Sequence, residues 1–447
     1  QGSHEAMLPL GRAASMLLLG ATVAAADAVA RRPLRELQPG AATPPPIDLV
    51  VAWVREPSQN EWPRVAARCP DAEPSRTRDS GELLTNILLA RRNLPWLRTI
   101  WVLTNDESPC FSSNGTWANF NKDKSAPRIR SVSHEKIWPP GALNGLPTYN
   151  SMAIEANMHR IDGLAEHFIY ANDDMFFLAP LEPEDFYDEQ DGYATPYVLI
   201  NPRRNTSTNL DLRSGGQEFV VTHNQAVAAS LAGRVVDAEA LFAAAKALYP
   251  HPWYRQPGQL LLNHMPYILR KSFVVEAQAR WPEVYSAHSS MPCRSGAWSK
   301  KMQEITGESN YSTTYSPVFS YNWFNVLHKN AKPSPRIYAR ADSLAIGAAR
   351  NYGFLEAHAD GYNVPCAEAA GDAHRIAEWL DNMSETKPMV LCLEDDFAQD
   401  CPVGDRTSAY AKEVSNYRKF FLKVTPGRHN HLSASQCRLC ADGLKEC

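Results

Sequence analysis

The sequence predicts an α/β fold built on a mostly parallel sheet with helices on its faces. Two runs rich in β-branched and aromatic residues, 47–54 and 99–104, are typical of strands buried on both faces. A segment with helical spacing, 81–93, separates them. A third apolar run, 168–170, ends directly in acidic residues. Strands that alternate with helices form parallel sheets with right-handed crossovers, and such sheets bind ligands beyond the carboxyl ends of their strands.

The remaining elements follow along the chain with their own signals. Residues 128–133 predict a short strand, and residues 151–160 predict a helix. From about residue 216 the pattern is mainly helical. Helices are expected over 237–248, over 258–279 with Pro266 as a break, and over 410–424, and a short strand with an acidic end over 389–397.

Composition sets the class of protein. The chain has 447 residues, 44% of them hydrophobic and 21% charged, which suffices for a large core. The net charge of −4 gives no basic field for nonspecific nucleic-acid binding. We divide the chain into a leader with a Pro-rich linker (1–46), a catalytic domain (47–428, with parts 47–215 and 216–428) and a Cys-rich tail (429–447).

The amino-terminal segment predicts entry into the secretory pathway. Residues 1–7 are interpreted as a tag remnant or an incomplete gene product. Arg12 precedes an apolar run, 13–26, with the proportions of a signal peptide, which becomes a short signal anchor if it extends to Ala30. The alternative is an Ala-rich surface helix. Acceptor tripeptides for N-glycosylation agree with a secretory location: they begin at Asn114, Asn205, Asn310 and Asn382.

The nine cysteines are expected to be mostly paired in that compartment. An odd number leaves either one free thiol or one pair between chains, as in a homodimer. Cys437, Cys440 and Cys447 suggest either a zinc site or a small disulfide knot. We favour the knot because no matching second Cys pair is present.

Two acidic strand ends are the candidate metal site. Asn172, Asp173 and Asp174 follow the apolar run 168–170, and Asp395 lies at the end of the strand predicted over 389–397. Carboxylate oxygens at a strand end suit Mg²⁺ or Mn²⁺ bridging a diphosphate. The alternative is an ordinary acidic loop at each position.

Two further groups of residues carry possible chemistry. His134 and the run Thr148, Asn150 and Ser151 lie in loops before helices, where Ser151 is expected to cap the helix and Asn150 to contact a sugar hydroxyl. The alternative is a capped helix with a solvated histidine.

His264 and Arg294, thirty residues apart, form a general base and a phosphate clamp if they converge. A lone histidine is otherwise usually structural.

The ordered motifs resemble the Stealth family of sugar-phosphate transferases. That family includes the catalytic subunit of N-acetylglucosamine-1-phosphotransferase and bacterial capsular polysaccharide hexose-1-phosphate transferases. Four blocks match in order, over 47–54, 82–178, 264–294 and 391–426. The second block is the most specific, because Leu-Pro-Thr-aromatic-Asn-Ser and Tyr-x-Asn-Asp-Asp both occur at matching spacing.

The resemblance implies a nucleotide-sugar-transferase-like sheet, of GT-A or Rossmann-like type, with the mainly helical half completing the site. It implies transfer of a sugar-1-phosphate, such as N-acetylglucosamine-1-phosphate, from a UDP-sugar to a glycan or polysaccharide acceptor, with release of UMP, in the Golgi lumen.

The resemblance also assigns roles to individual residues. It implies metal ligation by Asp173, Asp174 and Asp395. It makes His264 the base and Arg294 the clamp. By analogy with the fold, Asp48 and Trp53 line the nucleotide end of the first strand.

Two positions depart from the family pattern and keep other functions open. Arg55 and Glu56 follow Trp53-Val54 where the family usually has an acidic or amide residue and then Gly, and Leu84 replaces the usual Arg after Glu-Leu. Both changes touch the region expected to meet the donor. The alternatives are a glycosyltransferase that releases UDP and an inactive glycan-binding relative.

Overall fold

The computed structural model describes the parts of the chain that build the sheet and its helices. These are residues 44–55, 57–70, 81–105, 117–187, 199–201, 261–262, 266–280, 282–293, 354–358, 389–394 and 409–425, with a few shorter pieces between them.

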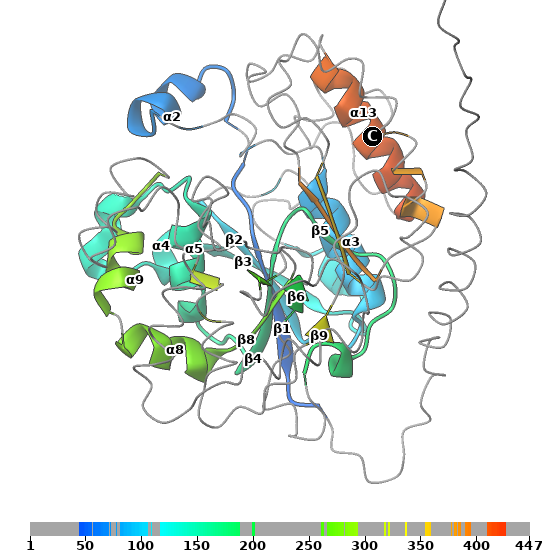
Figure 1. Cartoon of the computed structure of the whole chain (residues 1–447), viewed down its shortest axis with the longest axis horizontal. Helices are drawn as coiled ribbons and strands as arrows, with labels where there is room; N and C mark the ends of the chain where they lie inside the picture. The colour runs from blue at the N-terminus through cyan, green and yellow to red at the C-terminus, as the bar shows by residue number, and fades with distance from the viewer. Residues whose placement is uncertain are drawn as a thin grey trace, which may run out of the picture. The chain divides into compact units, whose positions relative to one another are not determined.

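A five-stranded sheet forms the centre of the described structure, in the order β3-β2-β1-β4-β8 (Figure 1). Its strands are β1 (Ile47–Ala52), β2 (Thr99–Thr104), β3 (Arg128–Ser133), β4 (His167–Asn172) and β8 (Tyr267–Arg270). The first four are parallel, and β8 runs antiparallel to β4. The predicted α/β class and its mostly parallel sheet are confirmed.

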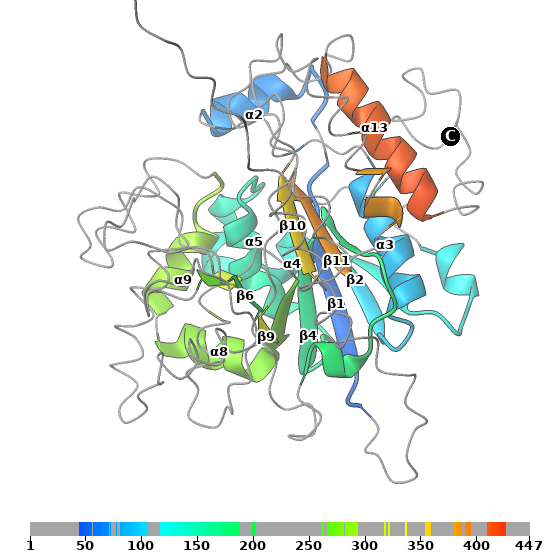
Figure 2. The same cartoon turned by 45° about the vertical axis from the view of Figure 1, so that its right-hand side comes forward.

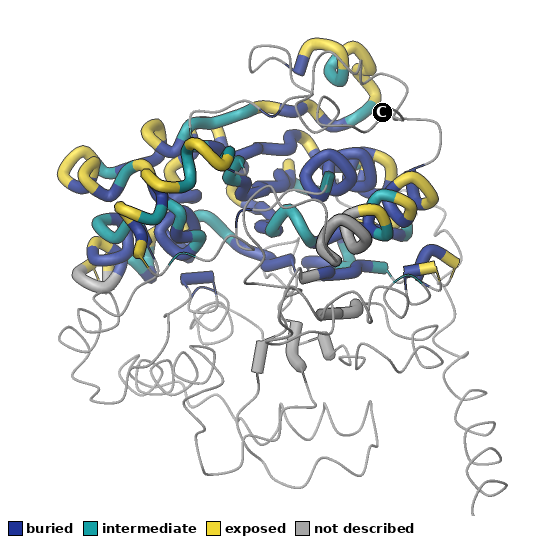
Figure 3. Tube along the Cα trace, turned by 90° about the horizontal axis from the view of Figure 1, so that it is seen from above, coloured by how far each residue is buried: buried dark blue, intermediate teal, exposed yellow. Residues whose placement is uncertain are grey.

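The inner strands form the core, as their uninterrupted apolar sequences predict. Every residue of β1 and β2 is buried. Figure 3 colours the described chain by burial, with the buried segments in dark blue. In register, Leu49 lies between Ile100 of β2 and Ile169 of β4, and all three side chains are fully buried. Burial on both faces explains why these strands lack the alternation of a half-exposed sheet.

Helices lie on both sides of the sheet (Figures 1 and 2). α3 (Glu82–Asn93) and α13 (Ala409–Val424) lie on one side. On the other side are α4 (His134–Ile137), α5 (Ser151–Asn157), α8 (Lys271–Arg280) and α9 (Pro282–Ser289). α2 (Trp62–Arg68) follows β1. The 3₁₀ helices are η3 (Phe120–Lys122), η4 (Pro140–Gly145), η5 (Met158–Arg160) and η6 (Pro183–Asp185).

Two small sheets extend the centre. One has the order β10-β11-β5, with β10 (Phe354–His358) parallel to β11 (Val390–Glu394) and β11 antiparallel to β5 (Met175–Phe177). The other has the order β7-β6-β9, formed by β6 (Leu199–Asn201), β7 (Leu261–Leu262) and β9 (Arg336–Ile337). Because β5 follows β4 after a turn, the first small sheet lies beside the end of β4.

The helix predicted over 258–279 is wrong in its first half. That stretch contains β7 and β8, and a helix begins only at Lys271. Tyr267, Ile268 and Leu269 are buried against β4, so tertiary pairing rather than local spacing decides their conformation. The described part of 216–428 therefore mixes strands with helices. The helix expected over 237–248 lies outside the described residues.

Within the part of the chain that the structure describes, no helix has the length and apolar character required to cross a membrane. The leader, the C-terminal cysteines and the four glycosylation acceptors lie outside that part.

Candidate functional site

Two adjacent aspartates, Asp173 and Asp174, form a turn at the carboxyl edge of the sheet. It connects β4 to β5, and both aspartates are half-buried. Ala52, the last residue of β1, lies opposite Asn172, so the loop after β1 begins beside this turn. The structure thus places the predicted acidic pair where ligands bind in parallel sheets.

Asn86 of α3 holds the backbone of this turn. Its side chain is fully buried, and its Nδ2 donates to the carbonyl oxygens of Asn172 (3.1 Å), Asp173 (3.4 Å) and Met175 (2.6 Å). Buried carbonyl groups need such donors, and a neutral amide supplies them without adding charge beside the aspartates. Sequence reasoning missed Asn86. The sequence pattern that could have identified it is an amide residue on a helix face that is otherwise apolar.

The second acidic strand end reaches the same turn. β11 pairs with β5, and the Leu393 amide donates to the Asp174 carbonyl oxygen at 3.0 Å. Glu394 ends β11, and Asp395 follows it in the sequence. Asp395 itself lies outside the described residues, so its metal role stays a prediction.

The two other distant candidates also follow or precede segments at this edge. β8 is antiparallel to β4, and its first residue, Tyr267, pairs with Tyr170 near the carboxyl end of β4. His264 lies three positions earlier in the sequence and Arg294 directly follows Cys293. Both lie outside the described residues, so their convergence stays a prediction.

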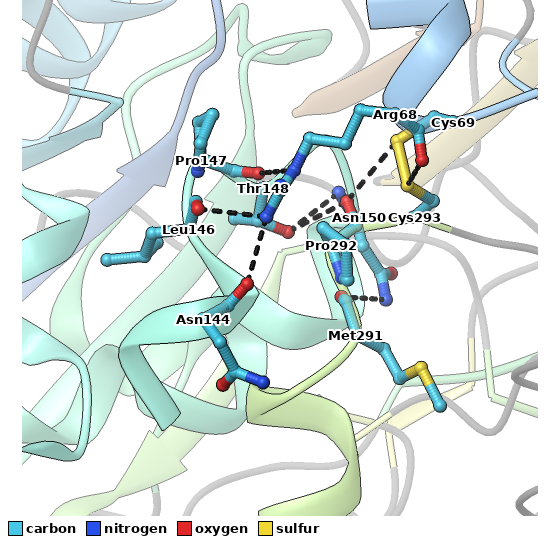
Figure 4. Close-up of a disulfide and its surroundings, with 10 residues drawn as sticks. All are labelled: Arg68, Cys69, Asn144, Leu146, Pro147, Thr148, Asn150, Met291, Pro292 and Cys293. Atoms are coloured by element: carbon cyan, nitrogen blue, oxygen red, sulfur yellow. Dashed lines mark hydrogen bonds between the residues drawn. A yellow bond between two sulfur atoms is a disulfide. The ribbon is translucent and has the colours of Figure 1, made fainter. Parts of the chain in front are cut away.

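A disulfide joins α2 to the segment that precedes Arg294 (Figure 4). Cys69, at the end of α2, is bonded to Cys293, with their Cα atoms 5.4 Å apart. Beside it, Arg68 donates to the carbonyl oxygens of Asn144 (3.0 Å), Leu146 (2.8 Å) and Pro147 (3.0 Å). α2 is therefore bound to two segments that lie far from it in the sequence. Paired cysteines were expected, and this disulfide is the pair that the described residues contain; Cys392 is buried in β11.

The loop before α5 is built on the same segment (Figure 4). The Thr148 hydroxyl donates to the Pro292 carbonyl oxygen at 3.2 Å and accepts from the Asn150 amide at 3.1 Å. Asn150 Nδ2 donates to the Met291 carbonyl oxygen at 3.2 Å. Asn150 Oδ1 accepts from the Met152 amide, so Asn150 is the N-cap and the cap predicted at Ser151 is wrong.

These contacts give a structural explanation for two residues that were predicted to bind the substrate. Thr148 and Asn150 are buried and bonded within the protein, which accounts for their polar side chains without a sugar. Ser151 is half-buried in the first turn of α5. His134 begins α4 and is also buried, with its ring 6.1 Å from that of Trp138.

Asp48 is not placed at the nucleotide end of β1, and the predicted role does not fit its position. It lies near the amino end of the strand, fully buried. Its carboxylate forms an ion pair with Arg98 and accepts hydrogen bonds from Trp101 Nε1 (2.9 Å) and the Ala165 amide (2.8 Å). This buried carboxylate therefore joins β1 to β2 and to the segment that precedes β4. Trp53 does lie just beyond the carboxyl end of β1, where it is buried.

The described aspartates are chemically suited to a divalent cation but do not form a complete site. Asp173 and Asp174 offer the hard oxygen ligands that Mg²⁺ and Mn²⁺ prefer. No cluster of three or more His, Cys, Asp or Glu side chains suited to a metal ion occurs among the described residues. A third protein ligand would have to come from elsewhere in the chain, and Asp395 remains the predicted one.

Asn105 is a further group at this edge that sequence reasoning missed. It follows the carboxyl end of β2, and its Oδ1 atom is buried with no hydrogen-bond donor in the described part of the chain. Its signal was the same as that of Asn172, a polar residue directly after an apolar strand.

Comparison with known proteins adds an independent observation. The sequence profile "Stealth protein CR2, conserved region 2" matches residues 76–195. The chain carries Stealth conserved region 2. This confirms the resemblance inferred from the motifs, and the matched Stealth region contains α3, the Asp173–Asp174 turn and the Thr148–Asn150 loop.

Relatives found by comparison of whole sequences have related names. An exopolysaccharide phosphotransferase of Streptomyces coelicolor is 25% identical over 337 residues, which cover 74% of this chain and 48% of the relative. The human N-acetylglucosamine-1-phosphotransferase subunits alpha/beta are 37% identical over 122 residues, which cover 27% of this chain and 9% of the relative. The chain thus matches about half the length of the first relative and a small part of the second.

Among solved structures, mouse xyloside xylosyltransferase 1 in its apo form aligns with a TM-score of 0.29 and 13% identity, covering 66% of this chain and 87% of that one. A TM-score this low does not establish a shared topology.

Proposed function

We propose that this protein transfers a sugar-1-phosphate from a UDP-sugar, such as UDP-N-acetylglucosamine, to a hydroxyl group of a glycan acceptor. The observation that carries the proposal is the Asp173–Asp174 turn at the carboxyl edge, inside the matched Stealth region and beside the end of β11. The names of the phosphotransferase relatives support the same reaction class.

The reaction is proposed to exchange one phosphorus–oxygen bond for another. The acceptor oxygen attacks the phosphorus that bears the sugar, its proton passes to His264, and the bond to UMP breaks. The sugar C1–O bond is retained, so the anomeric configuration is unchanged. Arg294 is proposed to offset charge on the transferred phosphate.

A divalent cation, Mg²⁺ or Mn²⁺, is proposed to bind Asp173 and Asp174, with Asp395 as a third ligand. When bound, it would neutralise diphosphate charge. Asn86 supports this role because it keeps the turn in one conformation through uncharged hydrogen bonds.

We also propose that the protein works in the lumen of the secretory pathway, in the Golgi. The Cys69–Cys293 disulfide supports an oxidising compartment.

The test is to identify the nucleotide product. The purified protein is incubated with Mn²⁺ or Mg²⁺, a panel of nucleotide sugars and sugar acceptors, and the released nucleotide is separated. We expect UMP, and loss of its release in Asp173→Ala. Release of UDP would instead indicate glycosyl transfer and overturn the proposal.

A further inference from the structure

The loop between β1 and α2 carries a cation that the proposed reaction has not yet used. Arg55 lies three residues beyond the carboxyl end of β1. Its Nη2 donates to Glu61 Oε1 at 2.7 Å, and the Ser58 amide donates to Glu61 Oε2, also at 2.7 Å. The Glu61 carboxylate thus holds the guanidinium with one oxygen and the loop backbone with the other.

This ion pair is better explained by orientation than by stability. The Arg55 side chain is 28% exposed and that of Glu61 is 40% exposed, and ion pairs open to water contribute little to folding. Hydrogen bonds from Arg55 and Ser58 lower the pKa of Glu61 to about 2, so the carboxylate is charged at neutral pH. A charged partner on a fixed loop restricts the conformations of the arginine side chain. The side chain then loses less rotational freedom when it binds a ligand.

Tyr149 locates Arg55 relative to the rest of the site. Burial raises the pKa of the Tyr149 hydroxyl, and the positive charges of Arg68 and Arg55 act on it in the opposite direction. Both arginines are therefore within electrostatic reach of the loop before α5. Arg68 donates to three backbone carbonyl groups, whereas the Arg55 side chain is partly exposed to solvent.

The strand order brings this cation to the acidic turn. β1 pairs with β4 up to Ala52 and Asn172, so the loop with Arg55 and the turn Asp173–Asp174 follow neighbouring strands. Two carboxylates alone repel a diphosphate. The Arg55–Glu61 pair is neutral overall, so Arg55 would contribute a directed hydrogen bond to a phosphate oxygen, rather than net positive charge, on the side of the diphosphate facing β1.

We propose that Arg55 binds a phosphate oxygen of the nucleotide-sugar donor and that Glu61 is the positioning residue that holds its guanidinium. The inference rests on the proposed function for the identity of the donor. Arg55 is one of the two departures from the family pattern, so the contact is specific to this chain's own sequence.

The test compares Arg55→Ala, Arg55→Lys and Glu61→Gln with the control Arg128→Ala. Arg128 is an exposed arginine at the first position of β3, at the opposite edge of the sheet. UDP binding is measured by calorimetry with and without Mn²⁺, and initial rates are measured against UDP-N-acetylglucosamine. We expect Arg55→Ala to weaken UDP binding and to raise the donor KM by about 10- to 100-fold, with a smaller change in kcat.

The other variants distinguish a role of Arg55 in UDP binding from a role in protein stability. Arg55→Lys keeps the charge and should recover part of the affinity, and Glu61→Gln should give an intermediate loss because the guanidinium is held less firmly. Arg128→Ala should match the wild type. A purely structural role for Arg55 would lower thermal stability and leave UDP affinity unchanged.

The failures of the two proposals are distinguishable. Wild-type protein that binds UDP but releases no UMP would count against the proposed function, whereas loss of UDP affinity in Arg55→Ala would still support this inference. Equal UDP affinity in the wild type and Arg55→Ala would overturn it, as would a wild type that binds none of UDP, ADP, GDP and CDP.

Discussion

Two buried asparagines of α3 donate hydrogen bonds to backbone carbonyl groups, one at the acidic turn and the other farther from it. Asn86 donates to the carbonyl groups of the turn, and Asn93 donates to the Phe177 carbonyl oxygen at 2.5 Å, at the far end of β5. They form a matched pair for separating stability from metal binding.

We expect Asn86→Ala and Asn93→Ala each to lower the free energy of unfolding by about 1–3 kcal/mol, because each leaves buried carbonyl groups without a donor. Only Asn86→Ala should also weaken Mn²⁺ binding, since it alone loosens the aspartate backbone. Urea unfolding and Mn²⁺ titration measure the two effects. Equal Mn²⁺ affinity in both variants would show that Asn86 has no role in the site.

A second residue-scale prediction concerns a buried histidine of α9. Burial lowers the pKa of His288 from its ordinary value of 6.5 to about 3. Between these two values the unfolded chain binds a proton that the folded chain does not. Stability is therefore lost as the pH falls below about 6.5.

The slope expected from one such group is about 1.4 kcal/mol per pH unit. His159 behaves in the same way, with burial as the main cause of its pKa of about 3. We expect His288→Gln to reduce the dependence of unfolding free energy on pH between about 6.5 and about 5, whatever its effect at pH 7.5. An unchanged slope would mean that folding does not lower the pKa of His288.

At the element scale, the contact between η4 and α9 depends on the absence of a side chain. A Cβ atom at Gly145 would lie 2.1 Å from the Ser289 carbonyl oxygen, which also accepts a hydrogen bond from Trp138 Nε1 at 2.8 Å. Gly141, in the same 3₁₀ helix, has open space at that position.

We expect Gly145→Ala to lower the melting temperature markedly, by an amount equivalent to about 2–4 kcal/mol, because a backbone carbonyl cannot move aside as a flexible side chain can. Gly141→Ala should have little effect. Thermal unfolding followed by circular dichroism compares them, and similar melting temperatures would contradict the close packing of η4 on α9.

The sequence predicted the elements whose pattern is set locally. β1 and β2 are long apolar runs, and α3 has clear helical spacing, so their bounds were nearly correct. β8 was missed because its four residues become a strand only through pairing with β4. Asp48 was misplaced because no sequence pattern reveals that Arg98 and Trp101 bring their donors to it.

At the scale of the whole molecule, the site depends on segments brought together from far apart. The acidic turn was predictable, because polar residues directly after a buried strand must be exposed, paired or bound. Its supports were not, since Asn86 precedes the turn by a long stretch of chain and β11 follows it by more than two hundred residues. Such contacts are created by topology.

The Cys69–Cys293 disulfide joins two such distant segments covalently. We expect the double variant Cys69→Ser/Cys293→Ser to lose about 2–5 kcal/mol of stability and to raise the susceptibility of the loop before α5 to proteolysis, because that loop is built on residues 291–292. Arg64→Ala, in the exposed part of α2, is the control. Limited proteolysis with mass spectrometry detects the change, and identical cleavage patterns would refute it.

The same bond has a consequence for a chain that has been cut. Cys69 and Cys293 are 224 positions apart, and β2, β3, β4 and β8 all lie between them. A protease that nicks the chain once anywhere in this interval therefore releases nothing, because each piece keeps one of the two bonded cysteines. Such a molecule would migrate as one species without reductant and as two fragments with it.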